Sequence, residues 1–160
     1  MQTTFTLRQF KPSDLDKVIE INRVCLPENY SPYFFMEIFE RFPATFIVAE
    51  LDDDMVGYIM CRIETGFSSM GILSISKKGH VVSVAVLPKY QRKGLGMALM
   101  NETMKNMRLY RAKECFLEVR ASNTPAVDMY KKLGFQVART AKGYYADGED
   151  AYVMTKKLAK

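Results

Sequence analysis

The sequence predicts a mixed α/β fold in which helices cover both faces of one central sheet. Strand and helix patterns alternate through the middle of the chain, over residues 80–86, 94–110 and 115–120. Strand patterns that are joined by short turns flank this region, as expected of antiparallel hairpins. The chain has 160 residues, of which 48% are hydrophobic and 26% charged, so one globular domain over residues 1–160 is expected.

The N-terminal part of the chain has the pattern of one strand followed by two helices. Apolar and polar residues alternate over residues 5–9, as in a half-buried strand. Apolar residues then recur at helical spacing over about residues 15–26, where Ser13 and Asp16 have the spacing of a capping box. Two prolines interrupt this helix, and the aromatic-rich residues 33–41 predict a second one.

The central part of the chain predicts a hairpin, a buried strand and a helix. Residues 45–50 and 56–63 have strand patterns and are separated by an acidic turn. Residues 66–79 contain glycine, serine and lysine, which predicts a loop or an irregular strand end. Residues 80–86 are almost continuously apolar and β-branched, which is typical of a strand covered on both faces. A helix is expected from residue 94 to about residue 110.

The C-terminal part of the chain predicts a strand, a helix and two more strands. The strand covers residues 115–120, and the helix covers residues 124–133 and ends at Gly134. Residues 135–139 and 151–157 have the last two strand patterns. The predicted order of elements is therefore β-α-α-β-β-β-α-β-α-β-β.

Composition and charge exclude several classes of protein. The net charge of +5 suits an anionic ligand or solubility, and is too small to indicate nucleic-acid binding. The three cysteines form no motif, so we expect reduced thiols at Cys25, Cys61 and Cys115. His80 is the only histidine, which excludes a multi-histidine metal site. The N-terminal residues are too polar for a signal peptide, and no apolar run approaches 18 residues. A cytoplasmic protein with no metal site and no membrane segment is expected.

A glycine-containing turn is a candidate phosphate-binding site. Residues 91–98, Gln-Arg-Lys-Gly-Leu-Gly-Met-Ala, follow the buried strand and open a helix. The first N–H groups of a helix have no partner within it and carry the positive end of its dipole, so they bind phosphate oxygens well. Gly94 and Gly96 allow a pyrophosphate to approach the backbone closely. The sequence is neither a Walker loop nor a GxGxxG motif, and a strand–helix turn with two glycines is the alternative.

A second block of residues lies one strand and one helix after this turn. It has the pattern Asn123-x-x-Ala126-x-x-x-Tyr130-x-x-x-Gly134-Phe135. Together, the two blocks resemble the acetyl-CoA site of the GNAT-type N-acetyltransferases. The order of elements is similar to that fold over essentially the whole chain. The resemblance implies a mostly antiparallel central sheet and acetyl-CoA as the cosubstrate.

Two further segments narrow the resemblance. Residues 26–30, Leu-Pro-Glu-Asn-Tyr, and residues 143–152, Gly-Tyr-Tyr-Ala-Asp-Gly-Glu-Asp-Ala-Tyr, are similar to the archaeal NatA-type catalytic subunits, which acetylate protein N-termini. The resemblance implies a peptide site formed by Glu28, Tyr30, Tyr144 and Tyr145. It also implies a cofactor site formed by Val84, Ala85, Val86, Gln91, Arg92, Lys93, Gly94, Leu95, Gly96, Met97, Asn123 and Tyr130. The residues themselves also allow a solvated Glu28 and an aromatic hairpin that packs on the sheet.

Acetyl transfer to an amine needs a base, a polarised thioester carbonyl and a proton for the departing thiolate. His80 and Glu118 are candidate bases, since each lies in a strand of otherwise apolar residues. The resemblance implies that the two side chains hold a catalytic water between them. A strand-end histidine, and a pairing of Glu118 with Arg120, are the alternatives. Tyr130 is the candidate acid or a core residue, and the backbone N–H of Val86 is the candidate partner of the carbonyl oxygen.

An N-terminal protein acetyltransferase is therefore the leading hypothesis. Its expected partners are protein N-termini as substrates and either the ribosome or an auxiliary subunit. A lysine or small-amine acetyltransferase of the same fold is the second hypothesis. A non-catalytic acetyl-CoA-binding or nucleic-acid-binding module is the third, and the lack of a basic cluster interleaved with aromatics disfavours nucleic acid.

Overall fold

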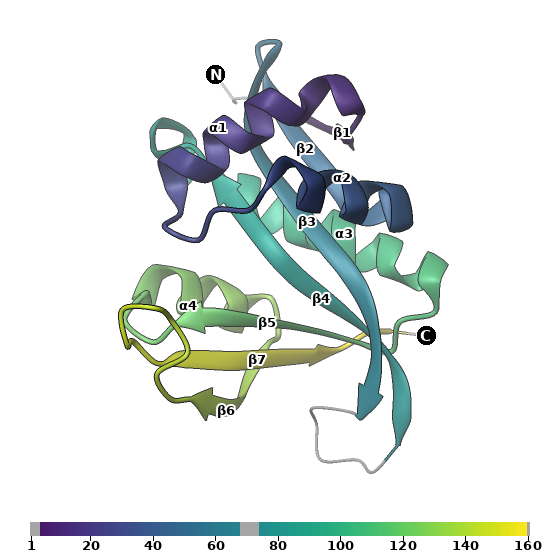
Figure 1. Cartoon of the computed structure of the whole chain (residues 1–160), viewed down its shortest axis with the longest axis vertical. Coiled ribbons are helices and arrows are strands. Elements are labelled where there is room, and N and C mark those ends of the chain that lie inside the picture. The colour runs from purple at the N-terminus through teal and green to yellow at the C-terminus, as the bar shows by residue number, and fades with distance from the viewer. Residues whose placement is uncertain (1–3, 68–73, 160) are drawn as a thin grey trace. The chain divides into compact units, whose positions relative to one another are not determined.

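The computed structural model describes residues 4–67 and 74–159 (Figure 1). Its strands are β1 (Phe5–Gln9), β2 (Phe46–Leu51), β3 (Asp54–Phe67), β4 (Ile75–Val86), β5 (Glu114–Arg120), β6 (Gln136–Ala141) and β7 (Ala151–Lys157). Its α-helices are α1 (Leu15–Cys25), α2 (Pro32–Arg41), α3 (Leu95–Asn106) and α4 (Thr124–Lys132). The strands pair in the order β1-β2-β3-β4-β5-β7-β6. The predicted order of elements is confirmed.

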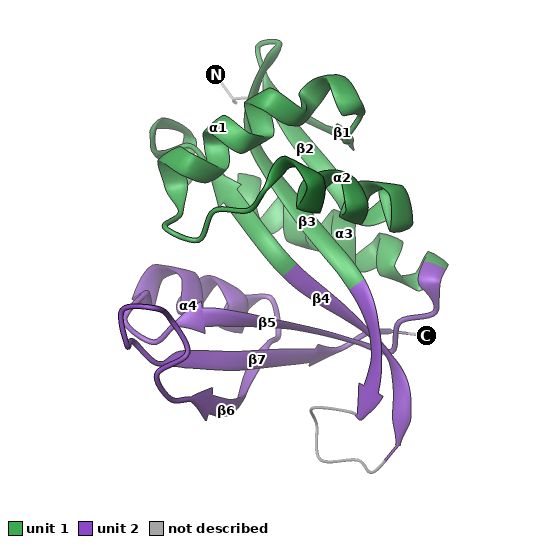
Figure 2. Ribbon diagram, in the orientation of Figure 1, with its two compact units in different colours: residues 1–62, 82–109 green, residues 63–81, 110–160 purple. Residues whose placement is uncertain are grey.

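The chain divides into two compact units (Figure 2). The first unit comprises residues 1–62 and 82–109, and the second comprises residues 63–81 and 110–160. Strands β3 and β4 each continue from one unit into the other. The expectation of one domain over residues 1–160 stays a prediction.

In the first unit, helices lie on both faces of the strands. Figure 1 shows α1 and α2 in front of β2 and β3, with α3 behind them. Val18 and Ile21 of α1, and Phe35 and Ile38 of α2, are buried at a spacing of three residues. This spacing places each pair on one face of its helix, and that face packs on the sheet. Val24, which shares the predicted apolar pattern, is 58% exposed and does not belong to the buried face.

The helix after the glycine turn, α3, also contributes to the core of the first unit. Leu95, Leu99, Met100 and Met104 are all buried on this helix. Met107 is fully buried in the 3-10 turn that follows. The methionines are therefore core residues. Together with Leu95 and Leu99, they bury one face of α3 in the core of the first unit.

In the second unit, the strands pair mostly antiparallel. β7 pairs antiparallel with both β5 and β6. β4 pairs in parallel with β5, from Lys78 opposite Glu114 to His80 opposite Phe116. α3 lies between these two strands in the sequence, as the crossover connection of a parallel pair requires. The mixed, mostly antiparallel fold is confirmed.

Three boundaries differ from the sequence-based expectation. The expected capping box of Ser13 and Asp16 is wrong, because the Asp14 carboxylate accepts the N–H of Lys11 instead, 2.9 Å away. β4 begins at Ile75, so the stretch 66–79, for which a loop or an irregular strand end is expected, contains the end of β3 and the start of β4. Its polar residues extend the strand because neighbouring strands supply hydrogen-bond partners, and the N–H of Lys113 bonds the carbonyl of Lys77. Residues 68–73 of that stretch lie outside the described residues.

α3 ends at Asn106, and a 3-10 turn replaces the rest of the expected helix.

Candidate active site

In the first unit, the turn before α3 exposes a glycine and two cationic side chains. Gly94 has φ +83° and is the N-cap of α3. This left-handed conformation is strained for other residue types, whereas a Cβ built there would meet no atom within 4 Å. Arg92 and Lys93 are exposed, and the Gln91 side chain donates to the carbonyl of Val86 over 2.9 Å. An open left-handed glycine, two cations and a helix N-terminus therefore occur together, as the candidate phosphate site requires.

The loop that contains Glu28 and Tyr30 is held by buried polar groups of the first unit. The Asn22 Nδ2 donates to the carbonyl of Glu28 and to the hydroxyl of Tyr58, over 3.1 Å in each case. The Tyr58 hydroxyl lies 2.6 Å from the Ser83 Oγ on β4. The Tyr30 hydroxyl donates to the carbonyl of Val82 over 3.3 Å. The loop backbone is thus connected through Asn22 to the core and to β4.

Asn22, Tyr58 and Ser83 are functional candidates that the sequence analysis missed. Asn22 is 1% exposed and Tyr58 is fully buried, and this burial raises the pKa of the tyrosine to about 12. Tyr58 is therefore a neutral hydrogen-bonding group at physiological pH. Asn22 lies on the same helix face as Val18 and Ile21. A polar residue on that apolar face was the signal by which the sequence could have indicated a buried, hydrogen-bonded side chain.

Three side chains from three strands form a cluster in the second unit. His80 on β4 lies between Glu64 on β3 and Glu118 on β5. Its Nδ1 is 2.6 Å from Oε2 of Glu64, and its Nε2 is 2.8 Å from Oε1 of Glu118. The imidazole stacks on the ring of Phe116, with centroids 4.3 Å apart and an interplanar angle of 10°. We refer to Glu64, His80 and Glu118 as the carboxylate–histidine cluster.

The cluster contains both predicted bases and one residue that the sequence analysis missed. The resemblance implies a water between His80 and Glu118. In the structure the two side chains are instead in direct contact, through Nε2 of His80 and Oε1 of Glu118. Arg120 pairs with Asp147 and Glu149. Glu64 is the missed residue, because it lies on β3 and belongs to neither glycine block in the sequence.

Helix α4 positions Asn123 and Tyr130 in the second unit. Asn123 is the N-cap of α4, and its Oδ1 accepts the N–H of Ala126 over 3.3 Å. Its side chain therefore has a structural role in addition to its predicted place at the cofactor. Tyr130 is 6% exposed, and its ring meets Phe135 edge-on with centroids 5.9 Å apart. Its ring is thus part of the core, and any chemistry rests on the hydroxyl alone.

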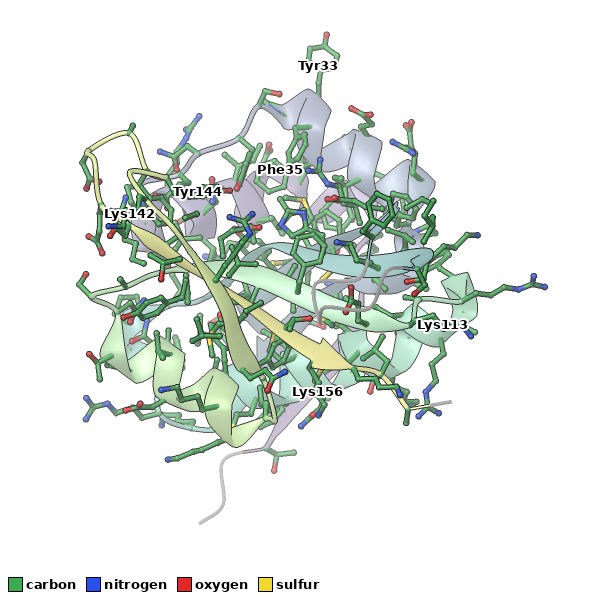
Figure 3. All side chains as sticks on the ribbon, turned by 90° about the horizontal axis from the view of Figure 1, so that it is seen from below. Tyr33, Phe35, Lys113, Lys142, Tyr144 and Lys156 are labelled. Atoms are coloured by element: carbon green, nitrogen blue, oxygen red, sulfur yellow. The ribbon has the colours of Figure 1, made fainter. Side chains whose placement is uncertain are left out.

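The loop between β6 and β7 presents the tyrosine pair. Tyr144 is 52% exposed and lies on the same loop as Lys142 (Figure 3), and its ring meets that of Tyr145 edge-on with centroids 5.0 Å apart. Tyr145 is half-buried, with the Arg120 guanidinium 4.1 Å from its ring centroid. That guanidinium also bonds Asp147 over 2.9 Å.

Ionised carboxylates help to order this loop. The N–H of Glu149 is the main cause that lowers the pKa of Asp147, and the hydroxyl of Ser122 is the main cause that lowers the pKa of Glu149. A lowered pKa means that the folded loop favours the charged form. This contribution is therefore present at neutral pH and is lost as the pH falls through the lowered pKa values.

Comparison with known proteins identifies the family. The model of the acetyltransferase (GNAT) family matches residues 15–135. The chain belongs to this family.

Relatives of this GNAT chain extend over nearly its whole length. An N-alpha-acetyltransferase from Sulfurisphaera tokodaii is 52% identical over 156 residues, covering 96% of this chain and 93% of the relative. The crystal structure of Ard1 from Thermoplasma volcanium has a TM-score of 0.83 at 28% identity and covers 98% of this chain and 99% of its own. The structure of Chaetomium thermophilum Naa20 in complex with a bisubstrate analogue has a TM-score of 0.81 at 30% identity, with coverages of 96% and 86%.

These findings confirm the predicted family, the fold and the assignment to the N-alpha-acetyltransferases. In the part of this GNAT chain that the structure describes, no group of histidine, cysteine and acidic residues is arranged to hold a metal ion. Within the same residues, no helix is long and apolar enough to cross a membrane.

Proposed function

We propose that the protein transfers the acetyl group of acetyl-CoA to the α-amine of protein N-termini by direct attack of that amine. The observation that carries the proposal is the carboxylate–histidine cluster, which holds an imidazole between two carboxylates on adjacent strands. Acetyl-CoA supplies an activated thioester as the acetyl donor. A structural neighbour, Naa20, is in complex with a bisubstrate analogue, which is consistent with an acetyl donor and a peptide bound together.

The chain offers suitable groups for the anionic part of acetyl-CoA. Residues 91–97 present the N-terminal N–H groups of α3, and Arg92 and Lys93 are exposed beside them. Residues 84–86 of β4 would hold the pantetheine, and the backbone N–H of Val86 would donate to the acetyl carbonyl oxygen. Asn123 and Tyr130 would lie at the thioester end.

Gly94→Val is expected to lower the affinity for acetyl-CoA by about tenfold or more. Valine disfavours the left-handed backbone by roughly 1–2 kcal/mol, and its methyl groups would occupy the space that phosphate oxygens need. A Cβ at this position would meet no atom within 4 Å, so the first side-chain carbon causes no clash within the protein. Isothermal titration calorimetry with acetyl-CoA measures the effect.

Gly148→Val is the matched control for this experiment. Gly148 has φ +89° and, like Gly94, no atom within 4 Å of a Cβ, but it lies in the loop between β6 and β7. The control should therefore carry similar backbone strain and keep the wild-type affinity for acetyl-CoA. Equal affinity of both folded variants for acetyl-CoA would contradict the assignment of the phosphate site to this turn.

The proton chemistry needs only a modest base. An α-amine with a pKa near 7.7–8.0 is roughly one-tenth neutral at pH 7, whereas a lysine amine near 10.4 is harder to deprotonate than the α-amine by about 3.5 kcal/mol. His80 and Glu118 would accept the proton that the amine releases as its nitrogen bonds to the acetyl carbon. The C–S bond breaks, and the hydroxyl of Tyr130 would donate a proton to the sulfur.

Glu28, Tyr30, Tyr144 and Tyr145 would bind the peptide. Tyrosine hydroxyl groups that bond the peptide backbone recognise many sequences alike, because every residue has the same backbone groups. Glu28 would contact the amine or the first side chain. These assignments predict broad acceptance of peptides with a free α-amine.

The substrate class is tested with two matched peptides and acetyl-CoA. One peptide has a free α-amine and no lysine, and the other has a blocked N-terminus and one internal lysine. Mass spectrometry should locate acetyl groups on the first peptide, with little transfer to the second. Equal rates would favour the lysine or small-amine acetyltransferase, and tight acetyl-CoA binding without transfer would favour the non-catalytic module.

Partners and location belong to the same proposal. Protein N-termini are the substrates. Binding to the ribosome or to an auxiliary subunit stays a prediction, which rests on the family resemblance. Full activity of the isolated chain on peptides would show that no auxiliary subunit is required. A cytoplasmic location stays a prediction from the polar N-terminal residues and the unpatterned cysteines.

A further inference from the structure

Glu64 makes the shortest contact of the carboxylate–histidine cluster, and it has no place in the reaction as proposed above. Its Oε2 lies 2.6 Å from Nδ1 of His80, the ring nitrogen that does not face Glu118. Glu64 and His80 are 16 residues apart, on the neighbouring strands β3 and β4. The two carboxylates thus take one ring nitrogen each.

The hydrogen atoms of the cluster can be counted from these contacts. At 2.6 and 2.8 Å, each nitrogen–oxygen pair needs a hydrogen between its atoms, because two lone pairs would repel at this separation. A neutral imidazole carries one N–H, and an ionised carboxylate carries none. The cluster therefore holds two protons among three groups. One of them lies between Glu64 and Nδ1, and the other lies between Nε2 and Glu118.

The surroundings distinguish the two contacts. The Glu64 side chain is 35% exposed and that of Glu118 is 17% exposed, so water stabilises the charge of Glu64 better. Glu64 is therefore the carboxylate that remains ionised and accepts the hydrogen bond, and the proton at Nδ1 stays with the ring. The proton between Nε2 and the less hydrated Glu118 is the one that can be gained and lost.

Stacking alone does not fix the imidazole. Phe116 defines the plane of the ring, but a half-turn about the Cβ–Cγ bond would keep that plane, exchange Nδ1 with a carbon atom and remove Nε2 from Glu118. A hydrogen bond at Nδ1 prevents this exchange. Lys78, whose Nζ lies 4.7 Å from the centroid of the same phenyl ring, is the cation beside the cluster on β4.

We propose that Glu64 is a positioning residue for the acetyl transfer: it holds the Nδ1 proton of His80 and so directs the exchangeable proton to the Nε2–Glu118 contact. The proposal rests on the function proposed above. Glu64 touches no reacting atom in it and acts only through the ring that it orients. The cluster loses one proton to solvent before the reaction and regains one from the substrate amine. Tyr130 regains from solvent the proton that it gives to the sulfur, so protons balance over each turnover.

The test uses the fact that His80 is the only histidine in the chain. Nitrogen-15 NMR of the histidine ring therefore reports this one side chain without assignment. In the wild-type protein at neutral pH, Nδ1 should have the chemical shift of a protonated nitrogen. Glu64→Ala should give a mixture in which Nδ1 loses part of this character, with kcat lowered about tenfold and the KM for acetyl-CoA unchanged.

Two further variants separate positioning from general destabilisation. Glu64→Gln keeps an oxygen that can accept from Nδ1, so it should restore part of kcat and part of the wild-type spectrum. Glu102→Ala is the control, since Glu102 is a carboxylate of similar exposure on α3 that pairs with Lys105. This control should leave both the spectrum and kcat at wild-type values.

A folded Glu64→Ala protein with the wild-type ring spectrum and wild-type kcat would overturn the proposal. A loss of kcat with an unchanged spectrum would also overturn it, because Glu64 would then act by another route. If the wild-type protein acetylates no peptide, the proposed function fails. The ring spectra would then still decide whether Glu64 holds His80.

Discussion

Replacing Tyr130 with phenylalanine is expected to lower kcat by about 10- to 100-fold, the scale of one lost acid–base interaction. The substitution removes only the hydroxyl that would protonate the departing thiolate. The ring is 6% exposed and keeps its contact with Phe135, so the free energy of unfolding should change by no more than about 1 kcal/mol. Steady-state kinetics and urea unfolding measure the two quantities.

Tyr33→Phe is the control for this substitution. Tyr33 is 88% exposed and projects from α2 into solvent (Figure 3), so its loss of a hydroxyl should affect neither kcat nor stability. Wild-type turnover in a folded Tyr130→Phe protein would leave Tyr130 as a core residue with no part in the chemistry.

The second large effect is expected from combined changes at His80 and Glu118. His80→Ala and Glu118→Gln should each lower kcat by about tenfold at pH 7. The double variant should lose about 30-fold rather than about 100-fold, because the two side chains are in direct contact and groups that act as one unit are not additive. Glu118→Gln keeps the shape of the side chain, so it separates charge from packing.

The dependence of kcat on pH provides an independent check of this base. More substrate amine becomes neutral as the pH rises toward the α-amine pKa of about 7.7–8.0, so the variants should recover part of their deficit there. A deficit that stays constant with pH would contradict proton acceptance by this pair. Wild-type kcat at pH 7 in the folded double variant would contradict it as well.

Hydrophobic periodicity was sufficient to predict most of the fold. The buried strand β4 and the amphipathic helices have strong patterns, since each buries a continuous face. The composition of residues 75–79 suits a loop as well as an irregular strand end, so the sequence alone did not locate the start of β4. They are strand residues only because distant segments pair with them. The N-cap before α1 was missed for a similar reason, because the Arg8 guanidinium binds the Asp14 carboxylate from another element.

The candidate site was predictable where a motif carried it. The glycine turn and the tyrosine pair lie in segments with a family pattern, whereas His80 and Glu118 were candidates because each lies in a strand of otherwise apolar residues. Glu64 and Asn22 belong to no such segment, and their contacts join residues 16 and 36 positions apart. A single sequence does not show which polar residues meet between elements, so Glu64 needed the structure, and for Asn22 the only signal was a polar residue on an apolar helix face.

The buried amide of Asn22 limits how this enzyme can evolve a new substrate preference. Both N–H groups of its Nδ2 are used, one by the Glu28 carbonyl and one by Tyr58. Exchange of side chains at positions 28 and 30 leaves that carbonyl in place, so the peptide selectivity that we propose for this loop would change by point mutation without loss of the bond. Insertion or deletion in the loop would move the carbonyl and leave a buried donor unpaired, at a cost of about 1–3 kcal/mol. Variation among descendants of this enzyme should therefore appear in the composition of this loop and not in its length.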